Sequence, residues 1–393
     1  MNKTLGFLLD VFYCSLSSFG GPEAHYGVFS QILVNKKKYI DEKTLSELIG
    51  VFALVPGPSS TQTITAIGYL FGGPWIAFLT FVIWAVPALI IMTLVGLFFS
   101  FFNQSLFLTS MLEVLPSIAV GFIVYAGWSL SKRVMIKKRY WLLYSLTFFA
   151  GFLLIPVTFF AVPILLLSSG FLLLSSEKVA QEKKRIINIK PNWMILLGIV
   201  IVAILLEIFS TQFQIPLLIL INSFFRYGYS VIGGGQIVIP LMIQDLVTQQ
   251  SLISLETFLS GYAIDQAIPG PLFSFAAFVG TQSLYALPLP WLGGFISGLS
   301  IFIPGVLLVF FVVPIWQTLR EINWLKTVLK GITIAAASLI TLTALTQILT
   351  LPSEWFSYGM VGFTFLTLQW KKIPTPILVG LLIVVGLLIQ SIN

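Results

Sequence analysis

A pair of helix-breaking motifs occurs twice in this chain, the second copy 213 positions after the first. Gly20-Gly21-Pro22 is followed by Pro56-Gly57-Pro58, and Gly233-Gly234-Gly235 is followed by Pro269-Gly270-Pro271. Each motif lies in an apolar stretch, where glycine and proline interrupt a helix and leave backbone groups without partners. Lipid tolerates such a break only where protein buries it or where it lines a cavity. Broken segments at corresponding places in two halves indicate the substrate site of a secondary transporter.

The composition places the chain in a membrane. Hydrophobic residues make up 58% and charged residues 9%, and the mean hydropathy is +1.01. Because a soluble domain carries about 25% charged residues, we expect a polytopic all-α membrane protein. The net charge of +7 is then a property of cytoplasmic loops and indicates no nucleic-acid partner. The single cysteine, Cys14, cannot form an intrachain disulfide, and we expect a buried thiol.

Clusters of lysine and arginine predict which loops face the cytoplasm. The clusters are Lys36-Lys37-Lys38 with Lys43, Lys132-Arg133 with Lys137-Lys138-Arg139, the segment 178–190, Arg320 with Lys326 and Lys330, and Lys371-Lys372. With these loops in the cytoplasm, the number of spans between them predicts a cytoplasmic N-terminus. The apolar run near Lys3 has no small-residue cleavage signal before Gly20, so we expect an uncleaved first segment. The predicted hairpins of two half-helices are 4–35, 44–71, 214–250 and 254–286. The predicted single spans are 74–100, 106–131, 140–155, 157–174, 193–209, 290–316, 331–350, 354–369 and 373–391.

This plan predicts two inverted repeats, each with two broken or re-entrant helical hairpins and about four further helices. We expect residues 1–175 to form the first repeat, 176–210 a basic cytoplasmic loop and linker span, and 211–393 the second repeat. At the offset that relates the motifs, Lys36-Lys37-Lys38 aligns with Gln249-Gln250-Ser251. One loop is basic and its equivalent is neutral, as opposite sides of a membrane require.

The tips of the hairpins are the predicted substrate site. A half-helix that begins inside the membrane points free N–H groups and a positive dipole end at whatever lies there, and two such N-termini would form an anion site. The alternative is that Pro-Gly-Pro merely kinks a helix. The candidate binding residues are Gly20, Gly21, Pro56, Gly57, Pro58, Ser59, Ser60, Gln62, Arg226, Gly234, Gly235, Gln236, Gln266, Pro269, Gly270, Pro271 and Ser274.

Ionisable residues inside apolar stretches are further candidates, because burying them in lipid is costly. Arg226 is the only arginine in the four hairpins, and its guanidinium could bind a dianion; otherwise it reaches the surface or pairs with Asp245 or Asp265. His25, the only histidine, could take up a proton or be a neutral, hydrogen-bonded side chain. Glu23 could couple protons or simply favour the start of a helix, and Asp265 could couple protons or pair with Arg226.

The motifs resemble those of the chromate ion transporter family over nearly the whole chain. In the first half the resemblance rests on Phe19-Gly20-Gly21-Pro22 with His25 and on Pro56-Gly57-Pro58. In the second half it rests on Gly234-Gly235-Gln236 with Pro240 and on the segment 266–273. The resemblance implies a bacterial inner-membrane protein that exports chromate and confers resistance, with sulfate as a competing ion. It implies no cofactor and no metal, and the expected partners are chromate, sulfate, the lipid bilayer and a second copy in a homodimer.

Three positions bear on the fit to the family pattern. Ser59 stands where Asn is frequent and Glu23 where a small residue is common, and Gln62 stands where an acid or amide is usual and has no carboxyl group to titrate. These departures leave the preferred oxyanion and any proton coupling at Gln62 open.

Other functions remain to be weighed against chromate export. A carrier or exchanger of sulfate or molybdate would use the same tips. An intramembrane enzyme would find little chemistry in a chain with one histidine, one cysteine and no metal-ligand cluster. A cation channel would need rings of carboxylates, whereas the tips offer hydroxyls and amides.

Overall fold

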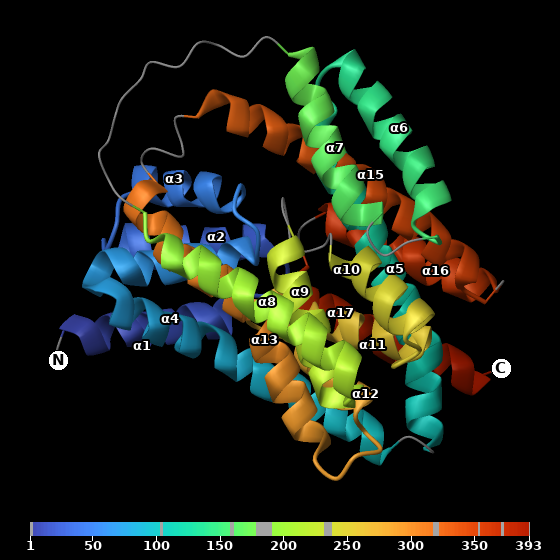
Figure 1. The fold of residues 1–393 in the computed structure, drawn as a ribbon. Helices are drawn as coiled ribbons and strands as arrows, with labels where there is room; N and C mark the ends of the chain where they lie inside the picture. The colour runs from blue at the N-terminus through green and yellow to red at the C-terminus, as the bar shows by residue number, and fades with distance from the viewer. Residues whose placement is uncertain are drawn as a thin grey trace. The chain divides into compact units, whose positions relative to one another are not determined.

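The computed structural model describes residues 3–102, 105–157, 161–177, 191–231, 238–316, 322–352, 354–370 and 373–392. Throughout these ranges the ordered elements are helices (Figure 1), apart from an isolated antiparallel bridge between Phe19 and Pro269. The expectation of an all-helical protein is confirmed. The predicted binding residues Gly234, Gly235 and Gln236 lie outside the described residues.

The helices follow the predicted order along the chain. In the first half they are α1 Lys3–Ser17, α2 Pro22–Phe29, η1 Ser30–Lys36, α3 Glu42–Phe52, α4 Ser59–Phe101, α5 Leu106–Val134, α6 Lys138–Leu154 and α7 Ala161–Ser176. Next come α8 Trp193–Phe213, α9 Pro216–Ser230, α10 Val238–Met242, η3 Ile243–Gln249, α11 Leu255–Asp265, η4 Leu272–Ser274 and α12 Phe275–Ser283. The last are α13 Pro290–Val312, η5 Val313–Ile315, α15 Asn323–Thr350, α16 Trp355–Trp370 and α17 Thr375–Ile392.

Corresponding helices of the two halves begin and end at the same offset that relates the motifs. This holds for α1 and α9, for the π-helical turns η1 and η3, and for α3 and α11. The N-caps correspond as well: the side chain of Asp41 accepts a hydrogen bond from the N–H of Thr44, and that of Ser254 from the N–H of Thr257. The duplication is therefore visible in local backbone structure, down to the capping of equivalent helices.

One boundary agrees with the prediction and another differs from it. The break expected between segments 44–71 and 74–100 is present within α4, where Gly72 and Gly73 have non-helical backbone angles, Gly73 with a φ of +78°, and the helix resumes at Pro74. Helix α15 begins at Asn323, so Lys326 and Lys330 lie in the helix and not in a loop before residue 331. Lysine is a good helix former, so the helix extends through these charged residues. A prediction from hydropathy alone starts the helix only where the apolar run begins, which is too late.

The chain forms two compact units that cut across the sequence halves. The first contains residues 1–100, 181–235 and 268–322, and the second contains 101–180, 236–267 and 323–393. In the first unit α13 packs along α8, α9 and α12. Small residues permit this packing, because a methyl group added at Gly228 of α9 would collide with the carbonyl oxygen of Ile301 on α13.

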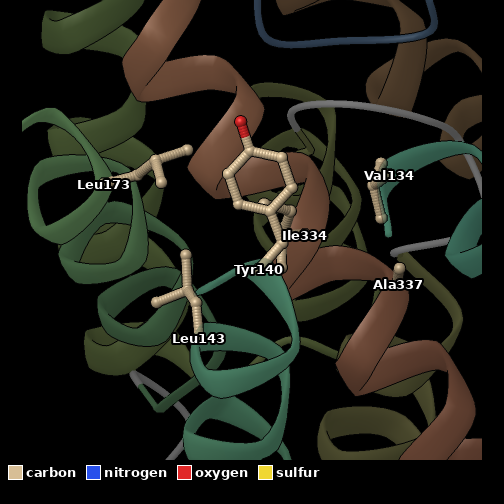
Figure 2. Packing of buried hydrophobic residues seen from close by; sticks show 6 residues of the cluster. All are labelled: Val134, Tyr140, Leu143, Leu173, Ile334 and Ala337. Atoms are coloured by element: carbon tan, nitrogen blue, oxygen red, sulfur yellow. The ribbon is translucent and has the colours of Figure 1, made fainter. Parts of the chain in front are cut away.

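In the second unit α15 packs against α5, α6 and α7, and α5 also packs against α11 and α16. Figure 2 shows the apolar cluster around the buried ring of Tyr140 at the start of α6. Its members come from four helices and are Val134, Tyr140, Leu143, Leu173, Ile334 and Ala337.

Five described helices are long and apolar enough to cross a membrane by length and composition, namely α4, α5, α8, α13 with η5, and α15. Helix α8 has a mean hydropathy of 2.6 over its most apolar window. Its exposed side chains include Met194, Leu197, Val200, Ile204 and Ile208. These recur at helical spacing and form an apolar stripe of the kind that faces lipid.

Candidate functional site

Two backbone hydrogen bonds join the motifs of the two halves inside the first compact unit. The N–H of Gly57 donates to the carbonyl of Val231 at 2.7 Å, and the N–H of Gly270 donates to the carbonyl of Ser18 at 2.8 Å. At the offset of the repeat, Gly270 is the equivalent of Gly57, and Val231 is the equivalent of Ser18. Each half therefore gives the same donor and the same acceptor to the other, which is the contact pattern of a two-fold relation.

The central glycine of each Pro-Gly-Pro is required by its conformation and its surroundings. Gly57 and Gly270 both have a φ of +122°, a region that residues with a side chain rarely adopt. A Cβ atom at Gly57 would lie 2.8 Å from the Cα of Gly305, and one at Gly270 would lie 2.5 Å from the Cβ of Ala88. The tips are thus packed against passing helices, and another residue would strain the backbone and collide with a neighbour.

The first glycine tip lies beside the second Pro-Gly-Pro. Phe19 forms a bridge with Pro269, and Gly20 has a φ of +82°. Helix α2 then begins at Pro22 with Gly21 as its N-cap. The structure therefore brings Gly20 and Gly21 together with Pro269 and Gly270, although the two pairs belong to opposite halves of the chain.

The first Pro-Gly-Pro is followed by a buried polar helix start. Helix α4 begins at Ser59, and its first full-turn hydrogen bond runs from the N–H of Gln62 to the carbonyl of Pro58 at 2.9 Å. The N–H groups of residues 59–61 precede that bond, so the helix itself supplies them with no acceptor. Ser60 is 4% exposed and Thr61 is fully buried. A positive dipole end and three hydroxyl groups thus meet at one buried place.

Each of these hydroxyls is hydrogen-bonded to an aromatic side chain. The Tyr26 hydroxyl donates to Ser59 Oγ, and the Trp84 Nε1–H donates to Thr61 Oγ1, each at 3.0 Å. His25 Nδ1 lies 3.0 Å from Ser60 Oγ. Because the Ser59 and Thr61 oxygens accept from these rings, their O–H groups remain free to donate to a ligand. Tyr26 and Trp84 were not among the predicted site residues. Tyr26 directly follows His25 and could have been predicted from that position, whereas nothing in the sequence links Trp84 to the tip.

Gln62 holds the loop in place. Its side-chain N–H₂ donates to the carbonyl of Pro56 at 2.8 Å and to that of Gly305 at 3.1 Å. Both acceptors are carbonyls, so the orientation of the amide follows from the hydrogen bonds. Its Oε1 is buried without a hydrogen-bond partner among the described residues. Gln62 thus ties the first Pro-Gly-Pro to α13.

The second Pro-Gly-Pro starts a less polar helix. Residues Leu272–Ser274 form a 3-10 turn, with the N–H of Ser274 donating to the carbonyl of Pro271 at 2.9 Å, and α12 follows from Phe275. Ser274 is buried, but its two predecessors are Leu272 and Phe273. The hydroxyl run of the first tip has no counterpart here, so the two tips are alike in backbone and different in side chains.

The remaining candidates lie on or beside α9, α11 and α2. Arg226 on α9 faces Glu207 on α8, with 3.9 Å between Nη1 and Oε2. Asp265 ends α11 and Gln266 caps it, both buried, in the second unit. Glu23 lies in the first turn of α2, where a carboxylate complements the helix dipole.

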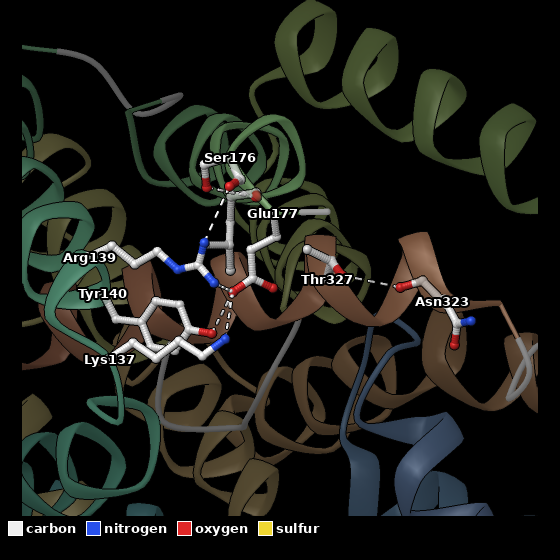
Figure 3. A network of polar contacts seen from close by, with 8 residues as sticks. Lys137, Arg139, Tyr140, Ser176, Glu177, Asn323 and Thr327 are labelled. Carbon is white, nitrogen blue, oxygen red and sulfur yellow. Dashed lines mark hydrogen bonds and ion pairs between the residues drawn. The ribbon is translucent and has the colours of Figure 1, made fainter. Parts of the chain in front are cut away.

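An acid–base cluster joins the start of α6, the end of α7 and helix α15 in the second unit, with Glu177 outside the predicted spans. Glu177, just after α7, accepts hydrogen bonds from the hydroxyl of Tyr140 at 2.7 Å and from Arg139 and Lys137 (Figure 3). The Tyr140 hydrogen bond, followed by the charges of Arg139 and Lys137, lowers the pKa of Glu177 below its usual value. Lys330 of α15 lies 4.7 Å from the centre of the Tyr140 ring, a cation–π contact. No group of three or more His, Cys, Asp or Glu residues in the described ranges could hold a metal ion.

The chain matches known membrane transporters over nearly its full length. An uncharacterised transporter of Methanocaldococcus jannaschii is 26% identical over 396 residues, covering 98% of this chain and 94% of that protein. The chromate transport protein of Cupriavidus metallidurans is 24% identical over 382 residues, covering 94% and 89%. The chromate transport protein of Pseudomonas aeruginosa is 22% identical over 274 residues, covering 67% and 63%. No solved structure matches this chain.

The chromate transporter family model matches the chain twice, over residues 5–175 and 218–388. The second match begins and ends at the same offset from the first that relates the motifs, the helix bounds and the reciprocal hydrogen bonds. Two matches of equal length account for most of the 393 residues. The chain is a membrane protein of a transport family, and it belongs to the chromate transporter family.

Proposed function

We propose that this protein exports chromate across the cell inner membrane by alternating access, and that helix N-termini at the two Pro-Gly-Pro tips hold the anion. The observation that carries the proposal is the buried first turn of α4. There Ser59, Ser60 and Thr61 combine free helical N–H groups with hydroxyls that can donate. Chromate accepts hydrogen bonds on four oxygens and carries two negative charges, and such a donor cluster complements it.

The reciprocal hydrogen bonds support an inverted repeat. We infer that residues 1–175 and 211–393 are related by a two-fold axis in the membrane plane, with 176–210 as linker. A two-fold relation gives two equivalent arrangements of the tips, one open to each side of the membrane, which is the basis of alternating access in inverted-repeat transporters. The lysines of the 36–38 loop and their neutral counterparts favour a cytoplasmic N-terminus.

The membrane potential favours export. Moving one charge across 100 mV is worth about 2.3 kcal/mol, so a dianion gains about 4.6 kcal/mol on leaving a negative interior. At about 1.4 kcal/mol per tenfold change, this sustains a gradient of roughly a thousandfold. Export needs no nucleotide hydrolysis.

Chromate flux into proteoliposomes under an imposed potential tests this function. We expect movement towards the positive side that excess sulfate inhibits, since both ions are tetrahedral dianions. Flux of sulfate or molybdate without chromate flux would reassign the substrate to another oxyanion. Failure of all three to move would overturn the proposed function.

A further inference from the structure

We propose that His25 binds a proton together with the anion, so that the dianion occupies the first turn of α4 while the imidazole carries one extra proton. This inference rests on the proposed function and adds a coupled ion to the same site. It uses a buried titratable group that anion binding by hydroxyls and helix N–H groups does not require.

The position of His25 is defined by a hydrogen-bond contact with Ser60 and by ring packing against Trp84. The side chain is fully buried, and its Nδ1 lies 3.0 Å from Ser60 Oγ in the first turn of α4. Its ring packs edge-on against Trp84, with centroids 5.4 Å apart. Nε2 is buried and makes no hydrogen bond among the described residues, while the backbone carbonyl of Gly20 faces the ring. The imidazole thus lies between the first glycine tip and the first turn of α4, and its Nε2 has no hydrogen-bond partner among the described residues.

The neutral ring can accept a proton in either tautomer. A neutral imidazole carries one N–H. The contact between Nδ1 and Ser60 Oγ is compatible with either tautomer, and in both one ring nitrogen keeps a lone pair. A second proton makes both nitrogens donors, and the backbone carbonyl of Gly20 and Ser60 Oγ are the acceptors that face the ring.

Among the described residues, the hydrogen-bond and ring contacts of His25 are with neutral groups, and titratable groups lie on the elements that pack nearby. From α4 its hydrogen-bond and ring contacts are the neutral Ser60 and Trp84. On α2 itself the titratable neighbours are Glu23 and Tyr26, and Tyr26 is bound to Ser59. From α1, which packs on α2, come Cys14, a buried thiol, and Asp10. Asp10 is already paired with Lys37 at 3.0 Å and accepts from Tyr39 at 2.7 Å; η1 contributes the exposed Lys36.

Electrostatics then sets the sign of the coupling. A proton on the imidazole and a dianion at Ser60, which contacts the ring, attract each other in a low-dielectric site. Linkage is reciprocal, so whatever the anion does for proton binding the proton does for anion binding. The proton adds to the lone pair of the unprotonated ring nitrogen and no other bond changes, so one proton is bound with each dianion. If that proton leaves with the anion, the net charge moved is −1 and a potential of 100 mV contributes about 2.3 kcal/mol to export.

Sulfate binding to the purified full-length protein tests this, because sulfate stays a dianion at neutral pH whereas chromate takes up protons itself. Calorimetry in two buffers of different ionisation enthalpy counts the protons bound. We expect about one proton per sulfate, and a Kd that rises with pH by up to about tenfold per pH unit. In His25→Asn the side-chain N–H₂ can still donate to Ser60, and we expect sulfate binding with no proton uptake and a Kd independent of pH.

Tyr26→Phe is the matched control, since it removes a neighbouring donor and no imidazole. It should weaken sulfate binding and keep the proton count at about one. Sulfate binding by the unaltered protein without proton uptake, or uptake that persists in His25→Asn, would overturn the role of His25 and leave the proposed function standing. If neither sulfate nor chromate binds at any pH, the anion site itself fails.

Discussion

At the residue scale, three aromatic side chains are hydrogen-bonded to the three consecutive hydroxyls of the proposed site. Ser59, Ser60 and Thr61 could be found from their place after Pro-Gly-Pro. Their partners could not, because Tyr26 and Trp84 reach them only through packing of α2 and of the second half of α4. A hydroxyl without such a partner could equally bond its own helix, as Thr63 does with the carbonyl of Ser59.

Trp84→Phe should weaken apparent chromate affinity by about tenfold, because a lost hydrogen bond at a charged ligand costs about 1.5 kcal/mol or more. The substitution removes the N–H that orients Thr61 together with part of the buried ring volume, and it keeps an aromatic ring beside His25. The concentration dependence of the initial rate of chromate flux measures this affinity. Thr63→Val, which removes a hydroxyl bonded within the same helix, is the control and should keep the wild-type affinity.

Arg226→Ala should reduce chromate flux by more than about tenfold if the guanidinium contacts the anion, because charge-assisted hydrogen bonds are worth about 1.5–3 kcal/mol. Its structural partner Glu207 supplies the matched variant, Glu207→Gln. Flux in proteoliposomes containing equal amounts of folded protein compares the two. Equal losses in both variants would assign Arg226 to the α8–α9 ion pair and remove it from the site.

At the element scale, the helix breaks are backbone structures with a defined geometry. Equivalent hydrogen bonds from Gly57 and Gly270 and equal φ angles show that each Pro-Gly-Pro is a specific turn. Sequence patterns located these breaks well, since proline and glycine act locally. They also located the break at Gly72-Gly73, where the backbone angles are non-helical, but they placed the start of α15 too late.

Gly270→Ala should abolish transport, because alanine at a φ of +122° is strained by about 1–3 kcal/mol and its Cβ would lie 2.5 Å from that of Ala88. Chromate flux and a thermal-unfolding midpoint report the two effects. Gly27→Ala is the control: it lies in α2 with no atom within 4 Å of an added Cβ, and it should not lower stability. Normal transport by Gly270→Ala would mean that the turn geometry is dispensable.

Acid should loosen the contact between α6 and α7. The pKa of Glu177 is lowered in the folded protein, so its contribution to stability is fully present above the ordinary carboxyl pKa and disappears as pH falls through the lowered value. The contribution of Glu177 to stability is therefore lost below about pH 4. Thermal unfolding in detergent from neutral pH to about pH 3 should show a steeper decline for the unaltered protein than for Glu177→Gln. Parallel curves would show that the cluster in Figure 3 carries no net stability.

At the scale of the whole molecule, a single offset relates the motifs, the helix bounds, the capping residues and the two family matches. The halves nevertheless differ in chemistry, with a polar helix start after one Pro-Gly-Pro and an apolar one after the other. The compact units each combine parts of both halves, so neither half is an independent folding domain by its contacts.

An inverted topology predicts that equivalent loop positions face opposite sides of the membrane. In a Cys14→Ser background, Lys36→Cys and Gln249→Cys place a thiol at two exposed positions that are equivalent in the two repeats. We expect a membrane-impermeant maleimide to label Gln249→Cys from outside intact cells, and Lys36→Cys only after the membrane is permeabilised. Labelling of both from the same side would rule out the inversion.

The sequence by itself determined the membrane class, the duplication, the helix breaks and the family, because each depends on residue type and spacing along the chain. Only the tertiary structure showed that the tips of one half pair with those of the other, and that His25, Tyr26 and Trp84 converge on the first turn of α4. It also showed that Arg226 faces Glu207. These are contacts between segments far apart in sequence, and they follow from helix packing and the satisfaction of buried polar groups, which no local pattern encodes.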